Sequence, residues 1–364
     1  MSEPPQPRPT PQSVTARLAR VSLPPTGRDL VALGLVRQVE VLPGEGAGAV
    51  VRVDLTLPGP FKAQQPRILT LVHKALEHLE GVDAVELRVD GQPAAPPVRR
   101  APQPVAGVRH LLAVGSGKGG VGKTTVAVNL AVALARRGLA VGLLDADVYG
   151  PNVPTMLGLK GAPNAEMVAG RLKPRVAHGV KVLSVGLLGA GDSALAWRGP
   201  LLAKMLHQLL FQADWAPLDL LVIDLPPGTG DVPLTLVQAA PLSGAVVVAT
   251  PQDVALEDAV RALGQLRDAG VPILGVVENM AFFACPQCGH EASLFGRGGA
   301  QRVAAAQGVP FLGELPLVEA IRAGSDTGRP AAADPALAPL FEPLATQVVR
   351  ALEALAARPV SGAS

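Results

Sequence analysis

A short glycine-rich segment, Gly117–Thr125, constrains the fold of this chain more than any other feature. It follows the apolar run His110–Val114, which is typical of a buried parallel strand. It precedes Val126–Arg137, which has helical spacing and contains no glycine or proline. The segment matches G-x-x-x-x-G-K-[ST] between a strand and a helix, and this context predicts a phosphate-binding loop, or P-loop. The alternative, a glycine-rich turn that binds nothing, is disfavoured by the same context.

Each part of the loop has a physical task in binding phosphate. Glycines allow successive backbone N–H groups to point at phosphate oxygens, and the N-terminus of the following helix adds partial positive charge. Lys123 is expected to reach the β- and γ-phosphates, and the hydroxyl of Thr124 is expected to ligate Mg²⁺. The predicted nucleotide-binding residues of the loop are Gly117, Lys118, Gly119, Gly120, Val121, Gly122, Lys123, Thr124 and Thr125.

The bulk composition limits the classes of protein to consider. The 364 residues are enough for two domains, and 48% apolar residues supply a sizeable core. A net charge of +2 gives no reason to expect nucleic acid or an anionic membrane as the main partner. No apolar run approaches the about 18 residues of a membrane-spanning helix, and the N-terminus lacks the apolar segment of a signal peptide. A cytoplasmic location with reduced thiols is therefore expected.

Changes in sequence pattern predict two domains. In the first, Ala49–Leu57 alternates like a half-buried strand, and Pro66 opens a helix with one apolar face. The expected boundaries are a disordered tail at 1–12, an α+β domain at 13–91, a proline-rich linker at 92–107, a larger domain at 108–358 and a tail at 359–364.

Apolar runs alternate with helical patterns in the larger domain, which predicts an α/β fold with a mainly parallel sheet and helices on both faces. Ligands of such sheets bind at the carboxyl ends of the strands. The stretch Leu337–Ala357 is expected to be a packing helix, because it lacks the basic face of a membrane-surface helix. The expected strands are Ala140–Leu144, Val180–Val185, Leu218–Ile223, Gly244–Ala249, Ile273–Val277 and Phe311–Gly313.

Acidic side chains follow two of these strands. Asp145 and Asp147 come directly after one strand, and Asp224 comes directly after another. Beside a P-loop, one acid of the pair is expected to orient the water that attacks the γ-phosphate, and the other to hold a Mg²⁺-bound water. Capping of a helix or a turn is the alternative for this pair. Asp224 is expected to accept hydrogen bonds from the water shell of the metal.

Two further residues are candidates for nucleotide contacts. Gly228 lacks a side chain, so its N–H can approach a terminal phosphate and make its loop sensitive to that phosphate. Asn279 follows the strand Ile273–Val277, and its carboxamide can pair with the edge of adenine. Stabilisation of a turn is the alternative for Asn279.

The two cysteines of the chain, Cys285 and Cys288, form one C-x-x-C pair. A redox dithiol normally opens a helix in a small thioredoxin-like unit, which is absent here. Half of a zinc site and half of an iron–sulfur site remain as alternatives, because each needs four ligands. One chain supplies two thiolates and at best His290, so four thiolates require two chains. The spacing favours neither metal centre.

Taken in order, these motifs resemble the Mrp/ApbC/Nbp35 family of iron–sulfur cluster carrier ATPases. The resemblance covers about Val108–Pro330 and includes a deviant Walker A motif, in which Lys118 is an extra lysine after the first glycine. The C-x-x-C beside Glu-Asn-Met separates this family from the related Min- and Par-type partitioning ATPases. The other matching segments are Asp145–Pro151, Trp197–Pro200, Asp224–Asp231, Thr250–Gln252, Glu278–Met280 and Cys285–Gly289.

The resemblance implies a SIMIBI-type P-loop NTPase that forms a homodimer, binds ATP and Mg²⁺, and hydrolyses ATP slowly. It also implies a labile [4Fe–4S] cluster that Cys285 and Cys288 of both subunits bridge and that passes to apo-proteins, with cluster scaffold proteins as further partners. In that family the lysine matching Lys118 reaches across the dimer and supplies positive charge to the partner's nucleotide. The acid matching Asp147 orients the attacking water, and the acid matching Asp224 serves the Mg²⁺ shell. The rival functions are a Min/Par-type spatial-organising ATPase and a zinc-bridged dimer scaffold.

The first domain resembles the MIP18-like (DUF59) domain that is often fused to bacterial members of this family. The resemblance rests on Arg28–Val36 and Leu55–Gly59. Two segments depart from it: Leu23–Pro25 replaces the usual Asp-Pro-Glu, and Pro60–Phe61 stands where a cysteine is often found. The domain is therefore expected to be a docking or interaction module.

Overall fold

The computed structural model of the chain divides into two compact units, Met1–Arg100 and Ala101–Ser364, and each is described by itself. No helix among the described residues is long and apolar enough to cross a membrane. The structure describes residues 9–23, 28–43, 49–62, 64–77, 79, 81–90, 92–93, 103–148, 150–162, 165–168, 170–188, 199–228, 236–237 and 239–356.

The smaller unit is an α+β domain with a four-stranded sheet of order β3-β4-β5-β6. Strand β4 pairs with β3 in antiparallel and with β5 in parallel orientation, and its side chains alternate between buried and half-buried, as the sequence predicts. Apolar side chains of α1 and α3 complete the core of the unit. The elements are α1 (Pro11–Leu18), β1 (Ser22–Leu23), β2 (Arg28–Asp29), β3 (Val36–Pro43), β4 (Ala49–Leu55), α2 (Gly59–Lys62), α3 (Gln65–Leu76), β5 (Val82–Val89) and β6 (Gln92–Pro93).

The ends of this unit differ from the sequence-based boundaries. Helix α1 begins at Pro11, inside the expected tail, because Thr10 and Ser13 form a capping box and proline occupies the first turn. Strand β6 lies inside the expected linker, and Val105 near the end of that linker is buried. Neither α1 nor β3 is expected from the sequence. Residues 1–8, 94–102 and 357–364 lie outside the described residues.

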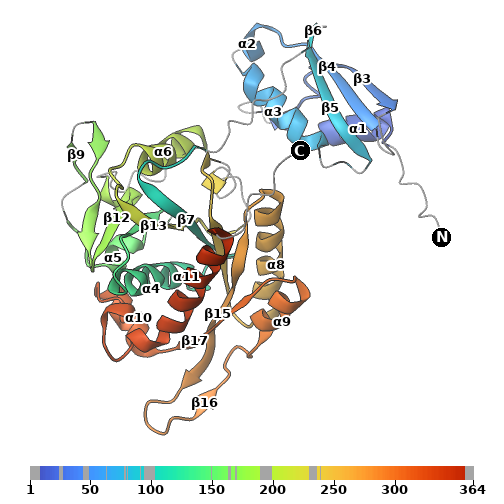
Figure 1. Cartoon of the computed structure of the whole chain (residues 1–364). Helices are drawn as coiled ribbons and strands as arrows, with labels where there is room; N and C mark the ends of the chain where they lie inside the picture. Colours follow the sequence, from blue (N-terminus) through green and yellow to red (C-terminus); the bar gives the residue numbers. More distant parts are fainter. Residues whose placement is uncertain are drawn as a thin grey trace. The chain divides into compact units, whose positions relative to one another are not determined.

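The larger unit is built on a nine-stranded, mostly parallel sheet of order β11-β12-β8-β13-β7-β14-β15-β16, with β17 beside β15 (Figure 1). Only the short strands β11 and β16 are antiparallel to the neighbours given for them. The main strands are β7 (Val108–Gly115), β8 (Val141–Asp145), β12 (Val180–Ser184), β13 (Leu218–Asp224), β14 (Gly244–Ala249), β15 (Ile273–Ala284) and β17 (Phe311–Leu317). The short strands of this sheet are β11 (Arg175–Ala177) and β16 (Glu291–Ala292), while β9 (Met167–Val168) and β10 (Arg171–Leu172) form a separate two-stranded antiparallel sheet.

Helices cover both faces of this sheet, as the sequence predicts, and alternate strand residues point into two separate cores. Leu112 and Val114 of β7 belong to the core that contains α4 and α11. Leu111 and Ala113 belong to the core that contains α6 and α8. The helices are α4 (Lys123–Arg136), α5 (Val153–Met156), α6 (Gly199–Phe211), α8 (Asp253–Asp268), α9 (Gly299–Ala306), α10 (Glu319–Asp326) and α11 (Glu342–Ala356), with short 3₁₀ turns at Val185–Leu187, Ala331–Ala333 and Ala338–Leu340.

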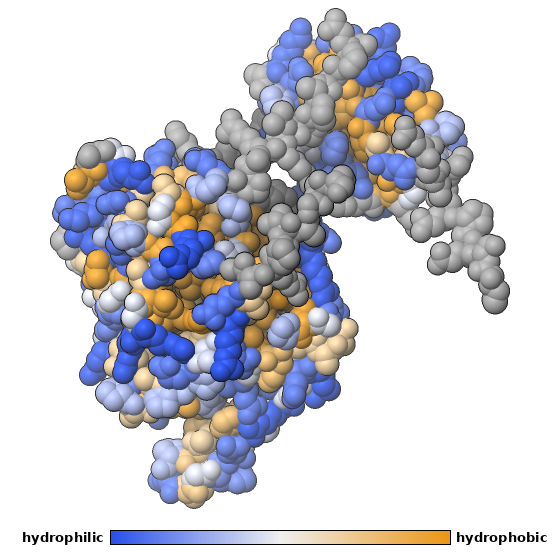
Figure 2. Space-filling model, viewed as in Figure 1, coloured by the Kyte–Doolittle hydropathy of each residue, from blue (hydrophilic) through white to orange (hydrophobic). Residues whose placement is uncertain are grey.

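Strand β15 is much longer than the expected Ile273–Val277. Its first half lies buried in the sheet, and its end pairs with β16, so that the two strands form a hairpin. This hairpin projects from the body of the larger unit (Figures 1 and 2). The C-x-x-C pair lies in the turn of the hairpin, between the end of β15 at Ala284 and the start of β16 at Glu291.

Candidate functional site

The P-loop lies between β7 and α4, where the sequence predicts it. Gly120 and Gly122 have φ angles of 81° and 79°, a region that glycine adopts without steric cost. A Cβ atom on Gly117 would lie 2.1 Å from the carbonyl oxygen of Asp258, so glycine is needed for α8 to pack against the loop. The loop geometry therefore depends on glycine at three separate positions.

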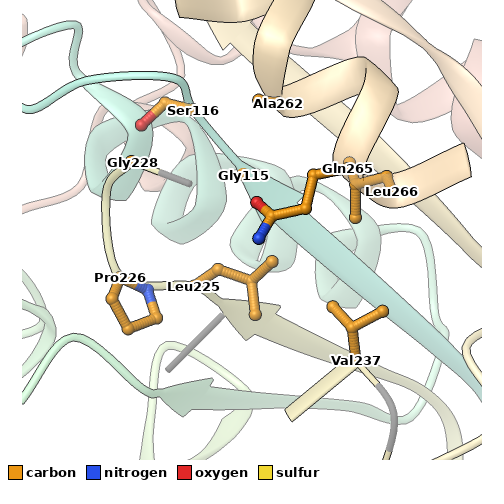
Figure 3. A pocket seen from close by; sticks show the side chains of 9 residues that line it. All are labelled: Gly115, Ser116, Leu225, Pro226, Gly228, Val237, Ala262, Gln265 and Leu266. Carbon is orange, nitrogen blue, oxygen red and sulfur yellow. The ribbon is translucent and has the colours of Figure 1, made fainter. Parts of the chain in front are cut away.

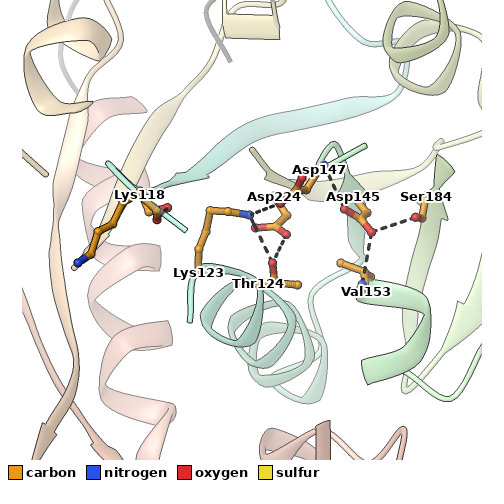
Figure 4. A network of polar contacts seen from close by, with 9 residues as sticks. Lys118, Lys123, Thr124, Asp145, Asp147, Val153, Ser184 and Asp224 are labelled. Atoms are coloured by element: carbon orange, nitrogen blue, oxygen red, sulfur yellow. Dashed lines mark hydrogen bonds and ion pairs between the residues drawn. The ribbon is translucent and has the colours of Figure 1, made fainter. Parts of the chain in front are cut away.

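Four of the predicted site residues meet at the start of α4 (Figure 4). The Nζ of Lys123 donates to Oδ1 of Asp224 at 2.6 Å and lies 4.0 Å from Oδ2 of Asp147. The Oγ1 of Thr124 donates to Oδ2 of Asp224 at 2.7 Å. Strands β8 and β13 are neighbours in the sheet, and their carboxyl ends bring these acids to the P-loop.

Asp224 is the centre of this cluster and is fully buried. Burial raises the pKa of its carboxyl group, while the charge of Lys123 and the hydrogen bonds from Lys123 and Thr124 act against that rise. Carboxylate and hydroxyl oxygens are the ligands that Mg²⁺ prefers, either directly or through water. Thr124 and Asp224 therefore form a donor set that fits the magnesium expected beside a bound nucleotide.

Asp145 is also fully buried, but it faces protein donors. Its carboxylate accepts hydrogen bonds from the N–H of Asp147 at 3.2 Å, the N–H of Val153 at 3.3 Å and the Oγ of Ser184 at 2.9 Å. Burial and the nearby charge of Asp224 raise the pKa of Asp145 to about 8, although the hydrogen bond from Ser184 lowers it. These contacts are of the capping kind, and a contact with a metal-bound water stays a prediction.

Lys118 lies apart from this cluster. Its side chain is half-buried and points away from Lys123 and Asp224 (Figure 4). The backbone carbonyl of Lys118 accepts a hydrogen bond from Ser116 at 2.9 Å, which holds the first turn of the loop. Among the ion pairs of the described residues, none involves Lys118.

Gly228 lies close to the P-loop, but its N–H already has an acceptor. It donates to the carbonyl oxygen of Ser116 at 3.0 Å. A small cavity of about 20 Å³ lies between this loop, the end of β7 and the side chains of Ala262 and Gln265 on α8 (Figure 3). The predicted contact between Gly228 and a terminal phosphate stays a prediction, and it requires the bond to Ser116 to open.

Asn279 contacts the P-loop backbone. Its Nδ2 donates to the carbonyl oxygen of Val121 at 2.9 Å, and the side chain is almost fully buried. A Cβ atom on Gly122 would lie only 2.2 Å from the same Nδ2. Asn279 therefore supports the loop that is expected to hold the phosphates, and its pairing with adenine stays a prediction.

The cysteine pair occupies a tight turn at the end of the hairpin. The N–H of Cys285 donates to the carbonyl of His290 at 2.9 Å, and the N–H of Gly289 donates to the carbonyl of Cys285 at 2.8 Å. Cys285 is half-buried, Cys288 is exposed, and neither forms a disulfide. Backbone N–H groups of Cys288 and Gln287 point at the sulfur of Cys285 and lower the pKa of that thiol, which favours the thiolate that binds metals.

Among the described residues of one chain, the cysteine pair has no further metal ligand beside it. Across the residues that the structure describes, no group of three or more histidine, cysteine, aspartate or glutamate side chains could hold a metal ion. His290 therefore does not complete a site with Cys285 and Cys288. Two thiols are an incomplete ligand set for zinc or for an iron–sulfur cluster, since each takes four ligands.

Some residues near these sites had no signal in the sequence. Ser184 contacts Asp145 from β12, and Arg297 contacts the cysteine hairpin from the segment before α9. Both contacts join segments that are far apart in the chain, so local spacing could not reveal them. The motif residues Tyr149, Trp197 and Arg198 and the stretch 229–231 lie outside the described part of the chain.

Comparisons with known proteins identify the families that the two units match. A family described as "NUBPL iron-transfer P-loop NTPase" matches residues 107–350, and a family described as "Iron-sulfur cluster assembly protein" matches residues 11–87. A relative from Deinococcus radiodurans, named iron-sulfur cluster carrier protein, is 47% identical over 316 residues, which cover 86% of this chain and 87% of that protein.

Solved structures share the fold of the larger unit. One is a nucleotide-binding protein from Archaeoglobus fulgidus in complex with ADP, which is 40% identical to this chain with a TM-score of 0.54. The match covers 61% of this chain and 87% of that protein's chain. The cell division ATPase MinD from Pyrococcus furiosus is 25% identical, has a TM-score of 0.53, and covers 66% of this chain and 98% of its own. The larger unit thus has the P-loop NTPase fold that the sequence predicts. The chain belongs to the iron-transfer P-loop NTPase family and carries an iron–sulfur cluster assembly domain on its N-terminal side.

Proposed function

We propose that this protein is an ATP-hydrolysing carrier of a labile [4Fe–4S] cluster, bridged across a homodimer by Cys285 and Cys288 of each chain. The observation that carries the proposal is the incomplete ligand set, because the described residues offer two hairpin thiols and no third ligand beside them. A [4Fe–4S] cluster takes four thiolates, and a two-fold axis near the hairpin would supply the other two. The relative named iron-sulfur cluster carrier protein favours a cluster over zinc.

The nucleotide site would work through the residues that meet at α4. The backbone of the P-loop and the N-terminus of α4 would hold the phosphates of ATP. Lys123 would exchange its bond to Asp224 for the β- and γ-phosphates, which leaves Asp224 and Thr124 to serve the Mg²⁺ shell. Asp147, half-buried beside Lys123, would orient the attacking water. The nucleotide-binding protein from Archaeoglobus fulgidus, in complex with ADP, supports nucleotide binding by this fold.

Lys118 would complete the nucleotide site of the second subunit. Its side chain points away from the Lys123 cluster of its own chain, and no ion pair of the described residues holds it there. A cation that reaches the partner's γ-phosphate would stabilise the charge that develops during phosphoryl transfer. Hydrolysis would then depend on the dimer, just as the cluster does.

Gly228 would report the state of the nucleotide. A γ-phosphate competes with the carbonyl of Ser116 for the N–H of Gly228, and the small cavity beside the loop gives Leu225 and Pro226 room to move. A nucleotide that binds two dimer arrangements with different affinity shifts the balance between them. Such a shift would change how tightly the four thiolates hold the cluster, and so its release to apo-proteins.

The proposed partners follow from the proposed cargo. Apo iron–sulfur proteins would receive the cluster and scaffold proteins would supply it, while the smaller unit would serve as a docking module. The proposed location is the cytoplasm, where thiols such as Cys285 and Cys288 stay reduced.

Anaerobic reconstitution tests the proposed cargo. Purified full-length protein is incubated with ferrous iron, sulfide and a reductant, desalted, and assayed for iron, sulfide, zinc and visible absorption. We expect a brown protein with equal amounts of iron and sulfide. A colourless protein that retains zinc and no iron would instead support the zinc-bridged scaffold, and a protein that retains neither would overturn both readings.

A further inference from the structure

A side chain that no motif includes, Arg297, holds the cysteine hairpin together. Its guanidinium lies over the ring of Phe282 on β15, with Cζ 4.3 Å from the ring centroid. It also donates to Glu291 on β16 at 2.7 Å and, through Nε at 3.1 Å and a second nitrogen, to Glu314 on β17. One side chain thus joins the two strands of the hairpin to the edge of the main sheet.

The residue next to Arg297 is fixed to the strand that supports the P-loop. The N–H groups of Gly298 and Ala300 each donate to the buried carboxylate of Glu278 at 2.6 Å. Glu278 is the neighbour of Asn279, whose amide holds the Val121 carbonyl of the P-loop. Through Arg297, these contacts extend from the P-loop to Phe282 and Glu291, on the two strands that flank the turn with the thiols.

The backbone of β15 is irregular between these two ends. Met280 has a φ of 57°, which is unusual for a residue with a side chain, and the register with β17 shifts between Asn279 and Phe283. Because the strand is irregular at this point, a movement at Asn279 would not pass directly along β15 to the hairpin. The Arg297 contacts bypass the kink, because they connect Glu278 to Phe282 and Glu291 through the segment before α9.

We propose that Arg297 is a positioning residue for the cysteine pair, and that it links the Asn279–Val121 support of the P-loop to the hairpin, so that nucleotide binding changes the exposure of Cys285 and Cys288. The inference rests on the proposed function, since it concerns the same loop and the same thiols. It assigns Arg297 no contact with nucleotide or cluster.

Alkylation of the two thiols tests the link in the metal-free, reduced full chain. The rate of maleimide modification of each cysteine is followed by mass spectrometry without nucleotide, with Mg·ADP and with Mg·ATP. In the wild type the rates with and without Mg·ATP should differ by about 5-fold or more, the lower range of measured couplings between sites. In Arg297→Gln the two rates should become equal while ATP binding, measured by calorimetry, stays at the wild-type value.

Two variants provide the comparison. Arg297→Lys keeps the charge but loses the planar fork and the stacked contact, so it should retain only part of the nucleotide effect. Arg52→Gln is the matched control, because Arg52 also joins two glutamates, Glu40 and Glu86, on neighbouring strands of the smaller unit. Arg52→Gln should keep the full nucleotide effect.

Several outcomes would overturn the link. One is a modification rate in Arg297→Gln that depends on nucleotide as strongly as in the wild type. Another is loss of this dependence in Arg52→Gln. A third is a wild-type modification rate that stays the same with and without Mg·ATP although ATP binds. If the hairpin of Arg297→Gln frays, seen as faster hydrogen exchange at the amides of Cys285 and Gly289, Glu291→Gln decides instead. It weakens the contact between Arg297 and β16 and leaves the stacked contact with Phe282 in place, and an undiminished nucleotide effect in this variant contradicts the link. Failure of the proposed function would show separately, as absent ATP binding or absent iron and sulfide.

Discussion

The nucleotide site and the cysteine hairpin of the larger unit are built in opposite ways. The Lys123 cluster of the nucleotide site is mostly buried and is held together inside one chain, because Lys123 pairs with Asp224 and Asp145 accepts hydrogen bonds from three residues. The hairpin projects from the body and presents two thiols without further ligands among the described residues. Under the proposed function, one chain suffices to bind nucleotide, whereas the metal centre needs a second chain.

The largest expected effect is that loss of a hairpin cysteine removes cluster loading and leaves nucleotide binding unchanged. Cys285→Ala or Cys288→Ala should abolish iron and sulfide loading, because a dimer would keep only two of four thiolates. Nucleotide affinity should stay at the wild-type value, since the hairpin turn lies away from the P-loop. Iron and sulfide assays with calorimetric ATP titration measure both. If a variant that lacks both Cys285 and Cys288 still retained a full cluster, the two thiols would not be its ligands and the contrast between the two regions would be wrong.

The converse change should remove hydrolysis and leave loading intact. Lys123→Ala deletes the cation expected at the transferring phosphate, and we expect the ATPase rate to fall by about 100-fold or more. Iron and sulfide loading should persist, because the thiols are unchanged. Phosphate release and iron assays on the same sample test this, and wild-type hydrolysis by the variant would refute the assignment of the P-loop lysine.

Mixing two variants tests whether Lys118 acts in the nucleotide site of its own chain or in that of the partner. Lys118→Ala should also be inactive, but a mixture with Lys123→Ala should regain activity. In a mixed dimer, the intact Lys123 site of one chain receives Lys118 from its partner. Phosphate release from the mixture, compared with each variant alone, measures this complementation. A mixture as inactive as its components would place Lys118 in its own chain's site or outside catalysis.

A smaller effect concerns the contact between the P-loop and β15. Gly122→Ala places a Cβ at positive φ and 2.2 Å from the amide of Asn279, so the free energy of unfolding of the larger unit should fall by about 1–3 kcal/mol. Gly120→Ala is the matched control for stability, because Gly120 has a similar positive φ of 81° but a Cβ there meets no atom within 4 Å. Thermal unfolding compares the two, and equal melting temperatures would contradict the contact.

The last prediction concerns the pH dependence of stability. The pKa of Asp145 is about 8 in the folded chain against an ordinary 3.8, so the folded state binds more protons between these values. The contribution of this carboxyl group to the free energy of unfolding is therefore fully present below about pH 4 and is lost as the pH rises towards 8. Asp145→Asn should flatten that decline. Thermal unfolding from pH 5 to 9 without nucleotide measures the slope, and an unchanged slope would argue against a protonated Asp145.

Local sequence patterns predicted where the P-loop and the acidic strand ends lie, and contacts between distant segments explain what the patterns missed. The glycines, Lys123 and Thr124 lie in one motif, and strand ends bring Asp147 and Asp224 to it. The capping contacts of Asp145 depend on Ser184 from another strand, and the length of β15 depends on pairing with β16 and β17. Contacts between such distant segments leave no spacing signal, and the role of Arg297 is hidden for the same reason.

The mass of the reconstituted protein under native conditions tests the central claim most directly. A cluster bridged by four thiolates predicts a species of two chains with about four iron and four sulfide ions, and no cluster-bearing monomer. The variant that carries both Cys285→Ala and Cys288→Ala should give no two-chain species with iron and sulfide. A single chain that carries the complete cluster, or a dimer whose iron survives the loss of all four thiols, would contradict the account.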